Sequence, residues 1–276
     1  MLLSPVVRSM FLALLSAVAA RSILAQGTAT IVMTSEVVAA GPAVNEPIFV
    51  RISFYNRSSE VVLLDATSRS DGFGLLAGQV LRPDGRKEEG PKLGVSEHRS
   101  IKRISVPAAE SASVLLLANT WSDFDLAGHY LLRAALTKPP KTEDGVELPL
   151  PAALEFVIEV GPRDSQRLER ICANLEQETL NQSGYASAVA ADTLAYVKDD
   201  VAVPYLFRLL QRRDKLAPTL SLGLQRIATP RAVEALLPFV NDLSEDRRVS
   251  VRSALARIAA GTKDVSTRQR IADALR

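Results

Sequence analysis

The chain has 276 residues, of which 47% are hydrophobic and 23% charged, and its formal net charge at pH 7 is +2. This composition is typical of a globular protein long enough for two domains, and the near balance of charge argues against a general nucleic-acid-binding surface. The single cysteine, Cys172, excludes an intrachain disulfide, so the fold has to be held by packing.

The N-terminal residues have the pattern of a secretory signal peptide. Arg8 supplies positive charge, residues 10–20 form a short, mostly apolar run, and small residues follow. This run is shorter than the about 20 residues that a transmembrane helix needs, and the rest of the sequence contains no other long apolar run. We therefore expect residues 1–25 to be a signal peptide, cleaved after Ala25 or alternatively after Ala20, and the mature protein to be secreted or periplasmic.

The next part of the sequence alternates between apolar and polar residues. Every second residue of 48–54 is Ile, Val, Ile or Phe, and residues 154–160 alternate in the same way. This period is typical of antiparallel strands with one buried face. Further strand-like runs lie at residues 29–38, 61–66, 73–81, 101–106, 112–117 and 130–136. About eight strands at this spacing predict an antiparallel, immunoglobulin-like β-sandwich over residues 26–161.

Residues 125–130 carry a local motif that supports this prediction. Leu126, Gly128 and Tyr130 resemble the tyrosine corner of immunoglobulin-like domains, in which a tyrosine hydroxyl bonds back to the preceding loop. Trp121, just before this motif, is expected either to be a half-buried packing aromatic or to close the end of the core. Two polar stretches, residues 82–99 and 138–151, are expected to be solvated loops.

After residue 161 the apolar period becomes helical. Apolar residues recur at steps of three and four in 168–175, 203–210 and 233–240. Thr229 before Pro230 is a helix-start signal, because it combines a capping hydroxyl with a proline whose missing N–H costs nothing in the first turn. Similar stretches at 194–197, 224–227 and 255–258 recur at intervals of about thirty residues, which is typical of stacked helical pairs. Cys172, within this pattern, is expected to be a buried apolar residue.

Residues 194–206 combine a small-residue helix end, an acidic turn and an Ala-Val-Pro helix start. In these features they resemble the HEAT-like repeats of bacteria, the type described from phycobilisome lyases. A second copy keeps Ala232 and Val233 but replaces the acidic turn. The resemblance implies a short HEAT-like α-solenoid over residues 162–276, and it implies architecture rather than activity.

Arginines gather in this second half of the sequence, with acidic residues nearby. They indicate either a solvated helix surface with paired charges or a basic surface that binds an acidic partner. For the second alternative, the candidate partner-binding residues are Arg208, Arg212, Arg213, Arg248 and Arg252.

The sequence offers no catalytic constellation. Its two histidines, His98 and His129, are too few for a multi-histidine metal site. Asp123 and Asp125 have the spacing of two calcium ligands, but their loop lacks the further acidic residues and the glycine of a calcium loop, so we expect structural turn carboxylates. Neither a nucleophile elbow nor a phosphate-binding glycine loop is present. We therefore predict no catalytic, cofactor-binding or metal-binding residues and no enzymatic activity.

The predicted function is that of an exported, non-catalytic protein-binding or scaffold protein whose partner is an unidentified protein. One alternative is an accessory factor or enzyme acting on an envelope ligand, as a lyase-like protein. Another is polysaccharide binding, for which Phe49 and Tyr55, on the strand face opposite Val50 and Ile52, are the clustered aromatic candidates.

Overall fold

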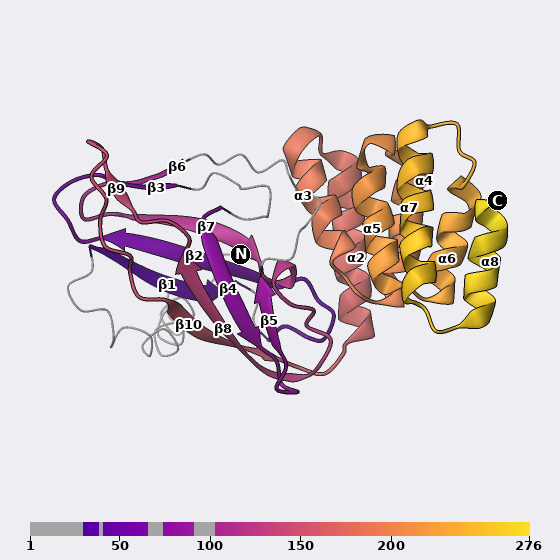
Figure 1. The fold of residues 1–276 in the computed structure, drawn as a ribbon, viewed down its shortest axis with the longest axis horizontal. Helices are drawn as coiled ribbons and strands as arrows, with labels where there is room; N and C mark the ends of the chain where they lie inside the picture. The colour runs from indigo at the N-terminus through magenta and orange to yellow at the C-terminus, as the bar shows by residue number, and fades with distance from the viewer. Residues whose placement is uncertain (1–29, 39–40, 66–73, 91–102) are drawn as a thin grey trace, which may run out of the picture.

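The computed structural model describes residues 30–38, 41–65, 74–90 and 103–276. Within these ranges, strands β1 to β10 come first and α-helices α2 to α8 follow (Figure 1). The predicted order, β and then α, is therefore present. The predicted signal peptide and His98 lie outside the described residues.

The strands form three antiparallel sheets. One sheet has the order β1 (Ile31–Val37), β2 (Phe49–Asn56) and β7 (Ser111–Leu117). The second has the order β10 (Leu154–Val160), β8 (Gly128–Leu136), β4 (Leu76–Leu81) and β5 (Lys87–Gly90). The third consists of β6 (Arg103–Val106), β3 (Val62–Asp65) and β9 (Lys141–Thr142).

The predicted immunoglobulin-like β-sandwich is wrong. The strands are divided among small sheets of three, four and three strands, and two of them lie where solvated loops were expected: β5 within 82–99 and β9 within 138–151. The physical reason is that a period of two reports one buried face for each strand but not which strand pairs with which. The local prediction at Tyr130 is confirmed, because its hydroxyl lies 3.1 Å from both the backbone N and O of Leu126.

Trp121 is buried against two glycines of the four-stranded sheet. It is 3% exposed, and its ring carbons lie where a side chain at Gly78 of β4 would be. A Cβ added at Gly90 of β5 would lie 2.8 Å from the Cα of Trp121. The absence of side chains at these two positions leaves the space that the indole ring occupies. Trp121 is therefore buried rather than half-buried.

Seven α-helices follow over the described residues 164–276. Their bounds are α2 (Ser165–Asn181), α3 (Gly184–Ala195), α4 (Val203–Arg212), α5 (Ala217–Ile227), α6 (Pro230–Leu236), α7 (Glu245–Gly261) and α8 (Val265–Leu275). The predicted start at Thr229 is confirmed, since its side chain accepts a hydrogen bond from the backbone N–H of Ala232 and Pro230 opens α6. Asp164 caps α2 in the same way through the N–H of Arg167.

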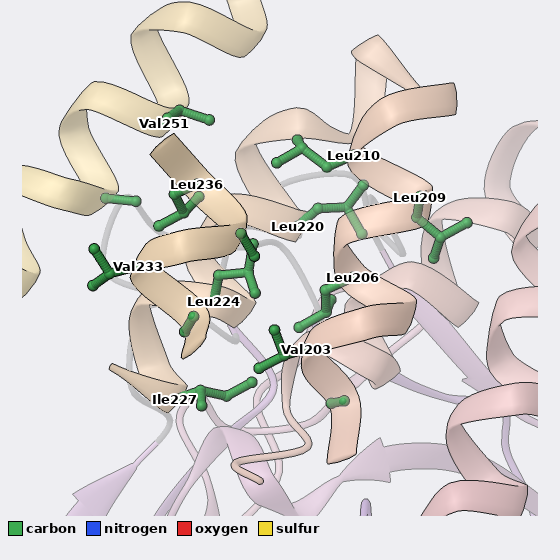
Figure 2. Close-up of a cluster of buried hydrophobic side chains, with 14 of the residues drawn as sticks. Val203, Leu206, Leu209, Leu210, Leu220, Leu224, Ile227, Val233, Leu236 and Val251 are labelled. Carbon is green, nitrogen blue, oxygen red and sulfur yellow. The ribbon is translucent and has the colours of Figure 1, made fainter. Parts of the chain in front are cut away.

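The helices bury one apolar cluster around α5, which contacts α3, α4, α6 and α7. Figure 2 shows Leu206 and Leu209 of α4 and Leu220 and Leu224 of α5 within this cluster. Cys172 of α2 is also a fully buried member, as predicted.

The predicted HEAT-like solenoid is wrong as well. The helices differ in length, from 7 residues in α6 to 17 in α2 and α7, and 3-10 segments interrupt the series at 200–202, 214–216 and 237–239. The recurring apolar stretches do mark buried positions in α3, α5 and α7. A common spacing of buried residues does not require units of equal shape, and these units are unequal.

The apolar residues form two separate cores. One cluster draws only on residues 31–160 and the other only on residues 168–275. We call the described residues of 30–160 the strand part and residues 164–276 the helical part. Each part has its own apolar core, and Figure 1 shows the two side by side along the longest axis.

Within the described ranges, no helix is both long enough and apolar enough to cross a membrane.

Candidate functional site

The arginines that the sequence singled out are largely engaged within the helical part. Arg208 of α4 makes a bidentate ion pair with Glu176 of α2, with Nε–Oε1 and Nη2–Oε2 distances of 2.7 and 2.8 Å. Its guanidinium also lies over the ring of Tyr205, 4.6 Å from the ring centre. The hydrogen bond to Glu176 raises the pKa of Arg208. This guanidinium links α2 to α4.

Three more of these arginines bond to backbone carbonyl groups. Arg213 donates to the carbonyl of Leu180 at 2.6 Å, in the last turn of α2. Arg248 donates to the carbonyl of Asp242, and Arg252 to that of Leu275. The carbonyls of Leu180 and Leu275 lie in the last turns of α2 and α8, where helix carbonyls lack intrahelical partners, and that of Asp242 lies in the loop before α7. Arg212 is exposed in the last turn of α4. Three of the five residues lie on or just after α4 and two lie on α7, and four of them are bonded within the helical part. Their partner-binding role stays a prediction.

A row of aliphatic side chains crosses the solvent face of the four-stranded sheet. Leu81 of β4 pairs with Leu131 of β8, and Leu131 pairs with Val157 of β10. Paired residues point to the same side of a sheet, and these three side chains are 37%, 38% and 54% exposed. We call Leu81, Leu131 and Val157 the apolar row.

Exposed polar residues border the apolar row on both sides. On one side Gln79, Arg133 and Glu155 pair across the same three strands, and the carboxylate of Glu155 lies 3.7 Å from the guanidinium of Arg133. On the other side His129 pairs with Glu159. An apolar centre with a polar rim is the arrangement found in protein-protein interfaces.

The strand part meets the helical part through charged side chains. Asp123, in the loop before β8, forms ion pairs with Arg226 of α5 at 2.7 Å and with Lys198, after α3, at 3.0 Å. Lys198 also lies 3.6 Å from Asp125. The guanidinium of Arg226 is held over the ring of Tyr196, 4.2 Å from its centre. The two aspartates, expected to be turn carboxylates, therefore also bind cations of the helical part.

Arg82 supports this loop from within the strand part. Its side chain is 2% exposed, although the sequence places it at the start of an expected solvated loop. It donates to the carbonyl of Asp123 at 2.8 Å and forms an ion pair with Asp125. Glu88 and Asp84 lie 3.5 and 3.6 Å away. The buried guanidinium thus fixes the loop that carries Asp123.

Asp199 lies at a second set of contacts between the two parts. Its carboxylate accepts from Arg163 at 2.6 and 2.9 Å, from Asn45 at 3.2 Å and from the N–H of Val201 at 3.0 Å. The hydrogen bond from Arg163 is the main reason that the pKa of Asp199 lies below its ordinary value. The amide of Asn45 belongs to the strand part, so Asp199 binds both parts.

Glu46 and Arg167 complete this second set. Arg167 of α2 forms an ion pair with Glu46 at 2.8 Å and donates to the carbonyl of Gly41 at 3.0 Å. The other carboxylate oxygen of Glu46 accepts from the N–H of Ala43 at 3.1 Å. These contacts tie the loop before β2 to the first turns of α2.

The aromatic candidates for polysaccharide binding are not neighbours. Phe49 is half-buried at the start of β2 and Tyr55 is exposed near its end. Arg51 and Ser53 lie between them on the same side of the strand, and six residues of strand span about 20 Å. The structure does not bring these two rings into one aromatic platform.

Within the described ranges, no three His, Cys, Asp or Glu side chains gather as a metal-binding group.

The site residues differ from those that the sequence indicated. The apolar row is formed by residues from three strands, and sequence reasoning missed it. The sequence shows one irregularity here: Leu131 is apolar at a position of β8 where the alternation predicts a polar residue, since Leu132 is the buried one. The sequence marks Asp123 through its spacing to Asp125, but its partners Lys198 and Arg226 are 75 and 103 residues further along the chain.

Comparison with known proteins identifies no family for this chain. No family model matches the chain, and no curated protein matches it. Solved structures with weak similarity include the Northeast Structural Genomics Consortium target SoR45, with 11% identity, 48% of this chain and 87% of that chain covered, and a TM-score of 0.33. BslA, a bacterial hydrophobin, has 14% identity over 50% of this chain and 98% of that chain, with a TM-score of 0.25.

A β-glucosidase of Listeria innocua, solved as a mutant with laminaribiose, has 14% identity and a TM-score of 0.25, covering 48% of this chain and 16% of that chain. At these scores the similarities carry no argument about fold or activity, and they give no support for the HEAT-like resemblance.

Proposed function

We propose that the protein is an exported, non-catalytic binding protein that holds a partner protein on the solvent face of its four-stranded sheet. The observation that carries this proposal is the apolar row of Leu81, Leu131 and Val157, which joins neighbouring strands on one exposed face. A paired antiparallel sheet holds such side chains in fixed positions, so little conformational freedom is lost on binding.

The size of the row sets what kind of interface it can be. Fully burying a Val or Leu side chain contributes about 1.5 to 3 kcal/mol. Leu81 and Leu131 are already nearly two thirds buried in the free chain, and Val157 is nearly half-buried. The row alone is therefore worth about 2 to 4 kcal/mol. Stable specific interfaces bury about 1,200 to 2,000 Å² in total, so the polar rim must take part.

The rim defines the chemistry of the partner. Arg133 and His129 are flanked by Glu155 and Glu159, so charges of both signs surround the apolar row. A partner with an aliphatic or aromatic centre and mixed charges at its edge fits this face. A uniformly charged polymer would meet like charges at the rim.

The test first replaces Leu131 by a photo-crosslinking amino acid in the producing cells, so that illumination links the partner protein to the sheet. The partner identified in this way is then purified, and its dissociation constant is measured for the wild type and for variants. We expect Leu131→Asp to raise the dissociation constant at least tenfold, because it places a charge at the centre of the apolar contact. The matched control is Leu115→Asp, because Leu115 is 48% exposed on β7 of another sheet. Absence of a crosslinked protein, or equal affinity of the Leu131→Asp variant and the wild type, would refute the proposal.

The export part of the proposal depends on the pattern of residues 1–25 and has its own test. The mature protein, isolated from the producing cells, is expected to begin at Gln26, or at Arg21 if cleavage follows Ala20. N-terminal sequencing or intact-mass measurement decides this. A mature protein that retains Met1 would contradict export through a cleaved signal.

A further inference from the structure

The exposed residues on the solvent face of the four-stranded sheet form rows that cross its strands. Lys87 of β5 pairs with Leu81 of β4, so its side chain lies on the same side of the sheet, at the end of the apolar row. In the order β5, β4, β8 and β10 (Figure 1), this row therefore reads Lys87, Leu81, Leu131 and Val157. Glu89, two residues after Lys87, belongs to the polar rim. The apolar row thus begins beside a cation.

The other end of the apolar row lies between two carboxylates. Glu155 and Glu159 are exposed on β10, two residues to either side of Val157. Residues two apart on a strand point to the same side of the sheet, so both carboxylates flank Val157. Glu155 lies 3.7 Å from the guanidinium of Arg133, which is also on the rim. The apolar row therefore runs from a cation at β5 to two anions at β10.

The polar rims set the width available along the row. Same-side residues of a strand are about 6.7 Å apart, so Arg133 and His129, on either side of Leu131, are separated by about 13 Å. An α-helix with its side chains is about 10 to 12 Å across. A helix laid along the apolar row therefore fits between the rims, whereas a helix laid along the strands would run over both of them.

The spacing of the strands also favours a helix over an extended strand. Neighbouring strands lie about 4.8 Å apart, so Leu81 and Val157 are separated by about 10 Å across β8. Helix residues i, i+3 or i+4, and i+7 share one face and span about 10.5 Å, with about 5 Å between successive contacts. Same-side residues of an extended strand are about 6.7 Å apart, so a strand crossing this sheet falls out of step with the row.

We propose that the partner held on this face presents an amphipathic α-helix, laid across the strands along the apolar row, with apolar residues at i, i+3 or i+4, and i+7. This inference rests on the proposed function, because it concerns the same face. Charge complementarity places an acidic residue of the helix about one turn beyond its contact with β4, where Lys87 lies. It places a basic residue at the opposite end, beside Glu155 and Glu159.

The same charges disfavour a second copy of this sheet as the occupant. When two copies pack face to face about a two-fold axis along the apolar row, Glu155 of one copy faces Glu159 of the other. When the axis runs along the strands, between β4 and β8, Glu89 faces Glu155 instead. Like charges placed opposite each other weaken an interface, so a partner helix of complementary charge fits better than a second sheet.

The test maps which partner residues lie along the row. Leu81, Leu131 and Val157 of the full chain are replaced, one at a time, by a photo-crosslinking amino acid, and the linked partner residues are identified by mass spectrometry. We expect a single partner segment in which the residues linked to positions 81 and 157 are about seven apart, with the residue linked to position 131 between them. In an extended strand the same two residues would be about three apart.

The possible outcomes separate this inference from the proposed function. A three-residue spacing, links to three unrelated segments, or links to a second copy of this chain would each overturn the partner helix while leaving a binding face. No link from any of the three positions would overturn the proposed function, and the helix with it.

The charge assignment is tested on the captured partner. Lys87→Glu is expected to raise its dissociation constant about three- to tenfold at low salt, and changing the facing acidic residue of the partner to lysine is expected to restore most of the affinity. The matched control is Lys141→Glu, because Lys141 is an exposed lysine on β9 of another sheet. An unchanged dissociation constant for Lys87→Glu, or an equal rise in both variants, would overturn the assigned charge.

Discussion

Gly90→Ala tests the packing that holds the four-stranded sheet. The methyl group added at this position would lie 2.8 Å from the Cα and Cβ of Trp121. Ordinary carbon contacts are about 3.5 to 4.0 Å, so one of the two backbones has to move by about 1 Å. The indole cannot relieve the clash by changing rotamer, because Cα and Cβ do not move with it.

The expected magnitude is the difference between two effects. Overpacking of this kind costs about 1 to 3 kcal/mol, while replacing glycine by alanine reduces the conformational entropy of the unfolded chain and stabilises by about 0.4 to 1 kcal/mol. Gly90 has no positive φ, so backbone strain adds nothing. We expect a net loss of about 1 to 2 kcal/mol in the free energy of unfolding of the strand part.

The assay is urea unfolding followed by tryptophan fluorescence. The chain has a single tryptophan, and Trp121 belongs to the strand core, so the fluorescence reports that part alone. The control is Gly161→Ala, whose added Cβ would lie 3.6 Å from the carbonyl of Pro42 in ordinary contact. It is expected to be as stable as the wild type or slightly more stable. A Gly90→Ala variant as stable as the wild type would refute the proposed contact.

Three further predictions concern single side chains. Tyr130→Phe removes the hydroxyl that bonds to the backbone of Leu126 and is expected to cost about 1 kcal/mol in the same urea assay; an unchanged midpoint would contradict this. Burial raises the pKa of the Cys172 thiol to about 12, so Ellman's reagent at pH 8 should modify it only in urea, and rapid modification of the folded chain would show the thiol to be accessible. The pKa of Asp199 is held below 3.8 by Arg163, so the stability it contributes is complete above pH 3.8 and is lost as pH falls through the lower, folded value. Subtracting the Asp199→Asn stability curve from that of the wild type should reveal this loss, and a difference constant with pH would count against it.

The strands with one buried face could be predicted from the sequence. The alternation at residues 48–54 corresponds to β2, and that at 154–160 corresponds to β10. By contrast, β5 has the sequence Lys-Glu-Glu-Gly, which carries no apolar residue. It is a strand because it pairs with β4 and because Gly90 packs on Trp121. Such nonlocal reasons leave no periodic signal, and they also explain why the predicted β-sandwich is wrong.

The candidate site was harder to predict for the same reason. Leu81, Leu131 and Val157 become neighbours only through the register of β4, β8 and β10. The arginine clusters are visible in the linear sequence because their members are close together along the chain. The bonds that engage them are not: Arg213, for example, donates to backbone carbonyls at the end of α2.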